Sequence, residues 1–304
     1  MPGSSIRWVT LPRSCLGVLK RFGVYLPPGF LPSGGPYPVL YLLRGHETEW
    51  VGMQDGRPGL RFILDRLIGE GLIDPLIVVL PGFMDRERRF QGIPVNWSAD
   101  GGPHGVGNGR MEDHFFEVRT WVQRHLPVRT DRRGAAIDGF SMGGYSAVML
   151  ATRYPRLFGS IGAYDGSFMW PGQIDPRRPP HGRACRLWFS ETCSVYFRRD
   201  GVWDRAKMER HNPITIIEKA DGDRLKALKR LVFHLHVAGD ERWGNVDRGH
   251  RMDLALQQRG IVNTFRKKGM VLDRRARHTW LWADRHLQAT LPLHMEVFRS
   301  KSLQ

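Results

Sequence analysis

Residues 135–151 read Ala135-Ala136-Ile137-Asp138-Gly139-Phe140-Ser141-Met142-Gly143-Gly144-Tyr145-Ser146-Ala147-Val148-Met149-Leu150-Ala151. A short apolar run meets the pattern Gly-x-Ser-x-Gly, with Ser141 as the central serine, and small and apolar residues follow. This order predicts a strand, a sharp turn and a helix. The serine of such a turn has a strained backbone, and glycines flank it because side chains there would collide with the strand and the helix. We therefore expect the Ser141 hydroxyl to project above a sheet edge, beside a helix N-terminus that stabilises negative charge.

Strands and helices are predicted to alternate along the rest of the chain. Continuous apolar runs at 38–43 and 76–80 are typical of strands buried on both faces, and residues 231–239 alternate as in a late strand. Helical spacing is found at 60–72 and 111–126, at 247–259, and from about 280 to 298. The pattern predicts an α/β fold with a mostly parallel central sheet, helices on both of its faces and a loop-rich cap insertion at 171–230.

Length and composition favour one large domain. The chain has 304 residues, of which 41% are hydrophobic, so a single α/β domain spanning residues 1–304 is the simplest prediction. No apolar run approaches the roughly 18 to 20 residues of a membrane span, and we expect no signal peptide. The three cysteines, Cys15, Cys185 and Cys193, cannot all pair with one another, which favours a cytoplasmic chain with free thiols.

The chain is strongly basic, with a formal charge of +16, and 38 of its 46 basic residues are arginine. Such a charge is found in proteins that bind nucleic acid, anionic surfaces or acidic substrates. The arginines are dispersed along the whole chain, however, and the densest basic run, at 266–277, lies beside a candidate catalytic histidine. We therefore expect a solvated basic surface rather than a specific nucleic-acid site.

A catalytic serine needs a general base, and the base needs a carboxylate that orients it. In chains with a Gly-x-Ser-x-Gly turn of this kind, the serine comes first in the sequence, the acid second and the histidine last. This sequence presents Ser141, then Asp240 after the strand at 231–239, then His278 just before the last helix. Glu241 and Asp247 lie close enough in sequence to replace Asp240. The predicted catalytic residues are therefore Ser141, Asp240 and His278.

Two backbone amides are expected to bind the oxyanion of the tetrahedral intermediate. One belongs to the residue after the nucleophile, Met142, and the other to the loop after the strand at 38–43, where His46 is the candidate. His46 as a metal ligand or base is the alternative, although no partner stands at ligand spacing. His234 and His236 share one strand face with no third ligand nearby in sequence, which favours a structural role. We expect no metal and no cofactor.

Four further residues are candidates for substrate binding. Arg44 and Trp50 belong to the loop after the strand at 38–43, where Arg44 would either attract an anionic group or turn to solvent. Trp97 lies in a long polar loop of the kind that covers binding sites, and would either form a wall of the pocket or pack on the core. Asp165 follows the strand predicted at 158–164, at the edge where sites form in open parallel sheets.

The motifs together resemble a family of α/β-hydrolase esterases that includes S-formylglutathione hydrolases, feruloyl and acetylxylan esterases, enterochelin esterases and mycolyltransferases. The resemblance runs from residue 25 to residue 282 and covers the segments 25–30, 38–45 and 138–144 and the ending His278-Thr279-Trp280-Leu281-Trp282, which is similar to the family's Gly-His-x-x-x-Trp. Two positions depart from it. Many members have Gly-x-x-Asp at the acid turn, where this chain has Arg242, and the residue before Gly45 is often His or Asp but is Arg44 here.

The residues and the resemblance predict a serine hydrolase that cleaves carboxylic esters of small molecules or glycans through an acyl-enzyme. Hydrolysis of a thioester, or acyl transfer to an alcohol, would use the same three residues and differ only in the acceptor. Two other classes stay open at this point. One is a catalytically silent hydrolase fold used as a binding module, for which the altered acid turn is the indication, and the other is a basic nucleic-acid-binding protein.

Overall fold

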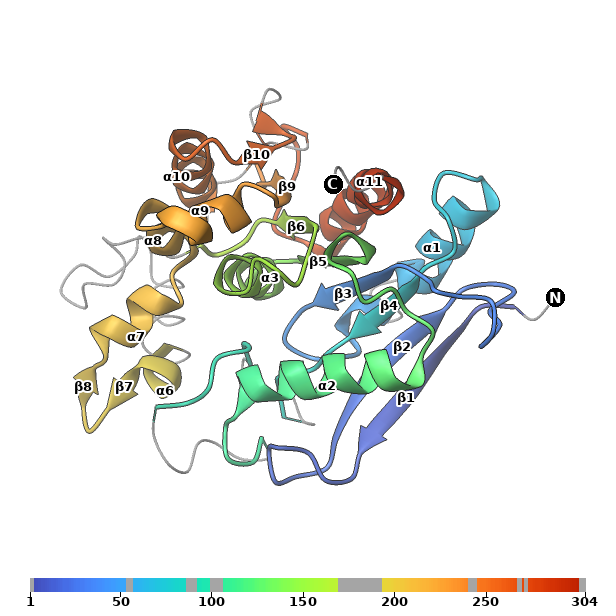
Figure 1. Ribbon diagram of the computed structural model, residues 1–304, viewed down its shortest axis with the longest axis horizontal. Coiled ribbons are helices and arrows are strands. Elements are labelled where there is room, and N and C mark those ends of the chain that lie inside the picture. The colour runs from blue at the N-terminus through green and yellow to red at the C-terminus, as the bar shows by residue number, and fades with distance from the viewer. Residues whose placement is uncertain are drawn as a thin grey trace.

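A mixed sheet forms the centre of the computed structural model, which describes residues 3–52, 57–85, 92–98, 106–168, 193–239, 245–266, 270 and 273–300. In the described part of the chain this sheet has eight strands in the order β1-β2-β4-β3-β5-β6-β9-β10 (Figure 1). Their bounds are β1 Ser5–Leu11, β2 Lys20–Leu26, β3 Val39–Leu43, β4 Ile77–Leu80, β5 Ala135–Gly139, β6 Ser160–Tyr164, β9 Val232–His236 and β10 Val262–Asn263.

The six neighbouring strands β4, β3, β5, β6, β9 and β10 run parallel to one another. Strand β2 pairs with both β1 and β4 in antiparallel fashion. Every residue of β3, β4, β5 and β6 is buried, which is why these segments are continuous apolar or small-residue runs in the sequence. The sequence analysis did not predict β1. It is a half-exposed edge strand, so its apolar pattern is weak.

Helices cover both faces of the sheet, as the sequence predicts. On one face lie α1 (Gly59–Gly69) and α11 (Trp280–Arg299), and on the other α2 (Met111–His125), α3 (Met142–Arg153) and α10 (Asn245–Gln258) (Figure 1). Two short 3₁₀ turns, η1 (Glu49–Val51) and η2 (Arg132–Gly134), precede α1 and β5. None of the helices within the described ranges combines the length and the apolar character that a membrane crossing demands.

The described part of the predicted cap, residues 193–230, is mostly helical. It consists of α6 (Cys193–Phe197), the hairpin strands β7 (Arg198–Arg199) and β8 (Val202–Trp203), α7 (Arg205–Arg210), α8 (Pro213–Glu218) and α9 (Gly222–Leu228). Helix α8 packs against α3 and α10, and the Tyr145 hydroxyl of α3 donates a hydrogen bond to the His211 carbonyl at 2.8 Å. This segment is therefore attached to the flank of α3. Residues 171–192 lie outside the described residues.

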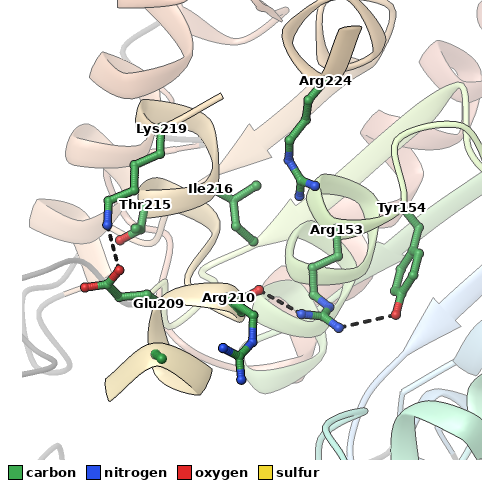
Figure 2. Close-up of a pocket in the computed structure, with 9 residues that line it drawn as sticks. Arg153, Tyr154, Glu209, Arg210, Thr215, Ile216, Lys219 and Arg224 are labelled. Carbon is green, nitrogen blue, oxygen red and sulfur yellow. Dashed lines mark hydrogen bonds and ion pairs between the residues drawn. The ribbon is translucent and has the colours of Figure 1, made fainter. Parts of the chain in front are cut away.

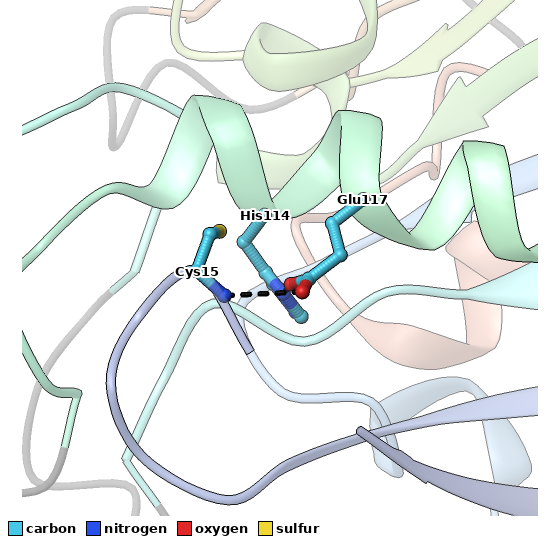
Figure 3. A group of neighbouring side chains, drawn as sticks. All are labelled: Cys15, His114 and Glu117. Carbon is cyan, nitrogen blue, oxygen red and sulfur yellow. Dashed lines mark hydrogen bonds and ion pairs between the residues drawn. The ribbon is translucent and has the colours of Figure 1, made fainter. Parts of the chain in front are cut away.

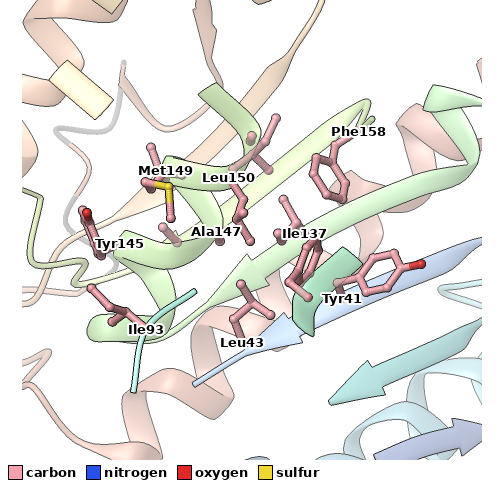
Figure 4. Close-up of a cluster of buried hydrophobic side chains, with 14 of the residues drawn as sticks. Tyr41, Leu43, Ile93, Ile137, Tyr145, Ala147, Met149, Leu150 and Phe158 are labelled. Atoms are coloured by element: carbon pink, nitrogen blue, oxygen red, sulfur yellow. The ribbon is translucent and has the colours of Figure 1, made fainter. Parts of the chain in front are cut away.

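The helix after the serine turn packs on the middle of the sheet. Figure 4 shows Ala147 and Leu150 of α3 above Ile137 of β5, next to Tyr41 and Leu43 of β3. All five side chains are almost fully buried. Each large apolar side chain buried in this way contributes about 1.5–3 kcal/mol to folding. The position of α3, and with it the position of the serine turn, is thus fixed by a continuous apolar contact.

A buried polar layer lies between the sheet and α11. The Asp138 carboxylate of β5 has no exposed surface and accepts hydrogen bonds from His286 Nε2 (3.0 Å), Thr290 Oγ1 (2.9 Å) and His294 Nε2 (3.1 Å). These three donors are spaced four residues apart along α11 and so share one helix face. Burial alone would raise the pKa of Asp138, but the two histidines outweigh it and hold that pKa well below its usual range.

The polar layer extends to β6 and β9. The Ser160 hydroxyl lies 2.6 Å from His294 Nδ1 and 2.9 Å from His234 Nε2, and His236 Nδ1 lies 2.8 Å from His286 Nδ1. The strand pair His234 and His236 is therefore engaged by other side chains of the core, in agreement with the structural role favoured from the sequence.

Replacing Asp138 with asparagine should be strongly destabilising, because the buried histidines then lose the anion that they share. We expect the free energy of unfolding, measured by urea titration at pH 7, to fall by about 3–5 kcal/mol. The conservative variant Thr290→Val, which removes one donor and keeps the charge, should lose only about 1 kcal/mol.

The effect of Asp138→Asn should also depend on pH. The pKa of Asp138 is lower in the folded chain than in the unfolded chain, where it is about 3.9. Its contribution is therefore complete at neutral pH and declines as the pH drops below about 4 toward the folded-state pKa. The difference in the free energy of unfolding between parent and variant should narrow in that range. A difference that is small at pH 7, or that does not change with pH, would contradict a buried carboxylate anion.

Candidate active site

Ser141 lies at the junction of β5 and α3 in a backbone conformation that residues other than glycine rarely adopt, with φ 57° and ψ −116°. It is the N-cap of α3, and its N–H donates a hydrogen bond to the carbonyl of Tyr164, the last residue of β6, at 2.9 Å. The side chain is 7% exposed. The strained serine turn predicted from the sequence is therefore present, with its hydroxyl at the positive end of a helix.

The two glycines of the motif are required by space. A Cβ at Gly139 would lie 2.4 Å from the backbone of Gly143, and one at Gly143 would lie 2.0 Å from the carbonyl oxygen of Leu43 at the end of β3. Both distances are far below contact, so any side chain would push α3 away from the strands. The close approach of β3, β5 and α3 thus depends on these glycines.

His278 lies beside the serine turn. Its ring packs on the ring of Phe140, the residue before Ser141, with 4.8 Å between the ring centroids. The backbone just before it is fixed by the Tyr164 hydroxyl, which donates to the Arg277 carbonyl at 2.7 Å. His278 Nδ1 is hydrogen-bonded to a carboxylate oxygen, Oδ2 of Asp165. The last helix and the end of β6 are therefore joined at this residue.

Asp165 is held more rigidly than an ordinary loop residue. It has a left-handed φ of 48° and is 1% exposed. The Ala238 N–H donates to its Oδ1 at 3.0 Å, and Asn245 Nδ2 donates to its Oδ2 at 3.2 Å and to its carbonyl at 3.1 Å. Arg248 in turn donates to Asn245 Oδ1 at 3.1 Å. These bonds orient the carboxylate toward His278.

In the described part of the chain the carboxylate bonded to His278 is that of Asp165, and Asp240 as the acid stays a prediction. Asp240 and Glu241 lie outside the described residues, and Asp247 pairs with Arg251 on the exposed side of α10. Asp165, which the sequence analysis placed among the substrate-binding residues, makes the contact instead. The physical reason is strand order: β6 is the immediate neighbour of β5, so the residue after β6 arrives next to Ser141. The sequence signal for it was an aspartate directly after a buried strand.

The His46 amide has a partner in this structure. Its N–H donates to Glu49 Oε2 at 2.6 Å, and its ring Nδ1 accepts from the Thr48 N–H at 3.2 Å. The other predicted oxyanion donor, Met142, is the first residue of α3, where amides have no acceptor one turn earlier in the helix. Glu49 must turn away before the His46 amide can bind an oxyanion.

Arg44 is inserted between aromatic rings beside the serine turn. Its guanidinium lies 4.9 Å from the Phe140 ring centre and 5.5 Å from that of Trp280. It donates to the Phe140 carbonyl at 3.3 Å and lies 3.4 Å from Glu49 Oε1. Burial lowers the pKa of Arg44, and Glu49 opposes that shift. Arg44 is therefore engaged within the wall of the site rather than turned to solvent, and its attraction for an anionic group of the substrate stays a prediction.

The two candidate tryptophans differ in position. Trp50 is 1% exposed, donates from Nε1 to the Leu43 carbonyl at 3.0 Å and contacts the Trp280 ring edge-on. It therefore lies behind the wall of the site, and the prediction that it contacts substrate is wrong. Trp97 packs its ring on Gly109, where a Cβ would lie 2.2 Å from that ring, and the backbone N–H of Trp97 donates to the Gly109 carbonyl at 3.0 Å. Its contact with substrate stays a prediction.

A second group of reactive side chains lies away from Ser141, where the β1–β2 turn meets α2. Figure 3 shows Cys15, His114 and Glu117 together, with potential ligand atoms within 4.8 Å of one another. The Glu117 carboxylate accepts from the Cys15 N–H (3.0 Å) and the Ser14 hydroxyl (2.9 Å) and lies 3.2 Å from His114 Nδ1. Burial and Glu117 raise the pKa of the Cys15 thiol to about 12. The visible role of this cluster is to attach the turn to α2.

The arrangement of the sheet and of the serine turn defines the class of fold. A mostly parallel sheet with helices on both faces, and a serine on a strained strand-to-helix turn, is the α/β-hydrolase fold. Solved structures agree: a ferulic acid esterase matches with a TM-score of 0.70 at 21% identity, covering 97% of this chain and 99% of that one. An S-formylglutathione hydrolase from Agrobacterium tumefaciens matches with a TM-score of 0.67 at 20% identity, covering 97% and 96%.

The chain belongs to the esterase family described as "Putative esterase", which matches residues 16–282. An endo-1,4-beta-xylanase/feruloyl esterase of Xylanibacter ruminicola is 29% identical over 187 residues, 57% of this chain and 23% of that protein. An esterase of Mycobacterium tuberculosis is 27% identical over 219 residues, 70% of this chain and 43% of that protein. The chain thus spans less than half the length of these curated relatives.

Substitution of Gly143 by alanine tests the close approach of α3 to β3. The added methyl group would meet the Leu43 carbonyl, so we expect a loss of about 1–3 kcal/mol in the free energy of unfolding. The matched control is Gly69→Ala at the end of α1, where nothing lies within 4 Å and where alanine should be neutral or stabilising. Equal effects of the two substitutions in chemical denaturation would contradict the steric explanation.

Proposed function

We propose that this protein hydrolyses carboxylic esters through an acyl-enzyme formed on Ser141. The observation that carries the proposal is the position of His278, which is bonded to Asp165 and packed on Phe140 beside the strained serine. A hydroxyl is a weak nucleophile, so it needs a base within reach and a carboxylate behind that base. The serine follows β5, the aspartate follows β6 and the histidine precedes α11. Because β5 and β6 are parallel neighbours, their ends lie at the same edge of the sheet.

The reaction has two halves with the same participants. Ser141 Oγ attacks the ester carbonyl carbon while His278 Nε2 takes the hydroxyl proton, and a tetrahedral intermediate forms. The bond to the alcohol oxygen then breaks, and His278 gives the proton to the leaving alcohol. Water next attacks the acyl-enzyme while His278 Nε2 takes one of its protons, and a second tetrahedral intermediate forms. The bond from the acyl carbon to Ser141 Oγ then breaks, His278 gives the water-derived proton to that oxygen, and the carboxylic acid leaves.

Asp165 takes the role of the orienting acid in place of Asp240. An ionised carboxylate can only accept a hydrogen bond, so it fixes the proton of His278 on Nδ1 and leaves Nε2 as the base. It also stabilises the imidazolium that forms in each half of the reaction. The bonds from Ala238 and Asn245 support this role because they leave the carboxylate little freedom to turn.

Met142 and His46 are the proposed amide donors to the oxyanion. The Met142 N–H stands at the first turn of α3, where the helix dipole also favours negative charge. The His46 amide joins it when the Glu49 carboxylate, now bonded to that amide, turns away and leaves the N–H to the oxyanion. Arg44 would keep the displaced Glu49 side chain close by.

The proposed substrates are esters of small molecules or glycans. The similarity to part of the Xylanibacter protein named as an endo-1,4-beta-xylanase/feruloyl esterase supports this class. Thioester hydrolysis and acyl transfer remain the alternatives, because the acyl-enzyme is common to all three and only the acceptor differs. The proposed steps need only side chains, backbone amides and water.

Replacing Ser141 with alanine should abolish hydrolysis of p-nitrophenyl acetate, with kcat reduced by about 10⁴-fold or more. Ser160→Ala is the matched control. Ser160 also lies against a histidine, His294, that contacts an aspartate, but it is fully buried within the core. Its variant should keep most of the activity while circular dichroism shows both variants folded. Activity that survives Ser141→Ala and is lost with Ser160→Ala would refute the assignment.

The identity of the acid is tested by comparing Asp165→Asn with Asp240→Asn. An asparagine at 165 cannot hold His278 in the required tautomer, so kcat should fall by about 10³- to 10⁴-fold with little change in KM. The variant at 240 should keep kcat within a few-fold, because His278 already has its carboxylate. Steady-state kinetics on p-nitrophenyl acetate measure both, and the reverse order of effects would restore Asp240 as the acid.

A further inference from the structure

Two adjoining pockets open at the C-terminal end of α3, on the flank formed by α7, α8 and α9. Their volumes are about 550 Å³ and about 380 Å³, and both are lined by Arg153, Tyr154 and Arg224. In Figure 2 the arginines of the larger pocket, Arg153, Arg210 and Arg224, gather on one side, with Lys219 and Glu209 on the other. Helices α7 and α9, the residue after α8 and the end of α3 thus contribute basic side chains to one hollow.

The positive charge of this pocket is only partly compensated. Glu209 pairs with Lys219 at 2.6 Å, and Glu112 pairs with Arg153 at 2.9 Å. Among the residues that the structure describes, Arg210 and Arg224 form no ion pair with a carboxylate, and Arg224 donates only to the carbonyl of Thr152 at 3.1 Å.

A buried acid, Glu112, holds the guanidinium of Arg153 in position. Burial would raise the pKa of Glu112, but the His211 ring 3.7 Å away, the hydrogen bond from the Tyr154 hydroxyl and the charge of Arg153 lower it. Glu112 therefore stays ionised and holds Arg153 at the pocket wall by accepting a hydrogen bond from Arg153 Nε at Oε1. Arg153 also donates to the Arg210 carbonyl at 2.9 Å. A positioned guanidinium loses less freedom when it binds an anion than a free one does.

The pocket is separate from the proposed ester site. Helix α3 has Ser141 at its N-terminus and Arg153 as its last residue, and 12 residues at about 1.5 Å each place these ends roughly 18 Å apart. The pocket also has an apolar part, formed by Ile216 and the ring of Tyr154. Its chemistry is therefore that of a cationic cleft with an apolar floor.

We propose that this pocket binds a small organic anion whose phosphate or carboxylate group contacts Arg210 and Arg224 and whose apolar body lies on Tyr154 and Ile216. The planar guanidinium fork matches both anions, and charge-assisted hydrogen bonds to it are stronger than neutral ones. The general basic charge of the chain attracts anions without regard to place and is screened by salt, whereas a contact inside this pocket depends on its own arginines.

The test uses phenyl phosphate as the probe, with the full chain at constant ionic strength. We expect it to raise the melting temperature, because a ligand that binds only the folded state stabilises that state. Sodium benzoate reports whether a carboxylate is also accepted, and inorganic phosphate reports how much the apolar body adds. Isothermal titration calorimetry gives the dissociation constant for phenyl phosphate.

The decisive comparison is between two double variants that each remove two exposed arginines. Arg210→Ala/Arg224→Ala should weaken phenyl phosphate binding by about tenfold or more, whereas Arg7→Ala/Arg13→Ala should leave it unchanged. The Ser141→Ala variant should bind as the parent does, which separates this result from the ester site. Absence of binding to the parent, or equal weakening in both double variants, would overturn the proposal.

Discussion

The hydrogen bond between His278 and Asp165 is the contact on which the arrangement of the site depends. It joins the start of the last helix to the end of β6, two segments more than a hundred residues apart. Each side of the bond is supported separately: the Tyr164 hydroxyl fixes the backbone before His278, and Ala238 and Asn245 fix the carboxylate. The histidine is thereby held against Phe140 in a closely packed wall, beside the serine.

The same region shows how the core and the chemistry are linked. Ser141 keeps its strained backbone because Gly139 and Gly143 allow β3, β5 and α3 to approach within contact distance. Helix α11, which follows His278, is tied to β5 by the buried Asp138 and its two histidines. The strand that presents the nucleophile and the helix that follows the base are thus fixed to each other through a buried charge.

Patterns that are local in sequence predicted most of the fold and part of the site. Buried apolar runs predicted the central strands, and the position of His278 before a helical segment singled out the histidine that packs on Phe140 beside the serine turn. The contact between His278 and Asp165 could not be predicted in this way, because it depends on which strand lies next to β5. The burial of Trp50, the Glu49 contact of the His46 amide and the half-exposed strand β1 likewise arise from tertiary packing, which single-sequence patterns do not contain.

The central claim is that one hydroxyl, that of Ser141, is activated at this edge of the sheet. Labelling of the protein with a fluorophosphonate, followed by mass spectrometry of the peptides, tests it most directly, because the reagent reacts with a serine only where a base activates it. The account predicts a single adduct, on Ser141. An adduct on any other serine, or none on the folded protein, would contradict it.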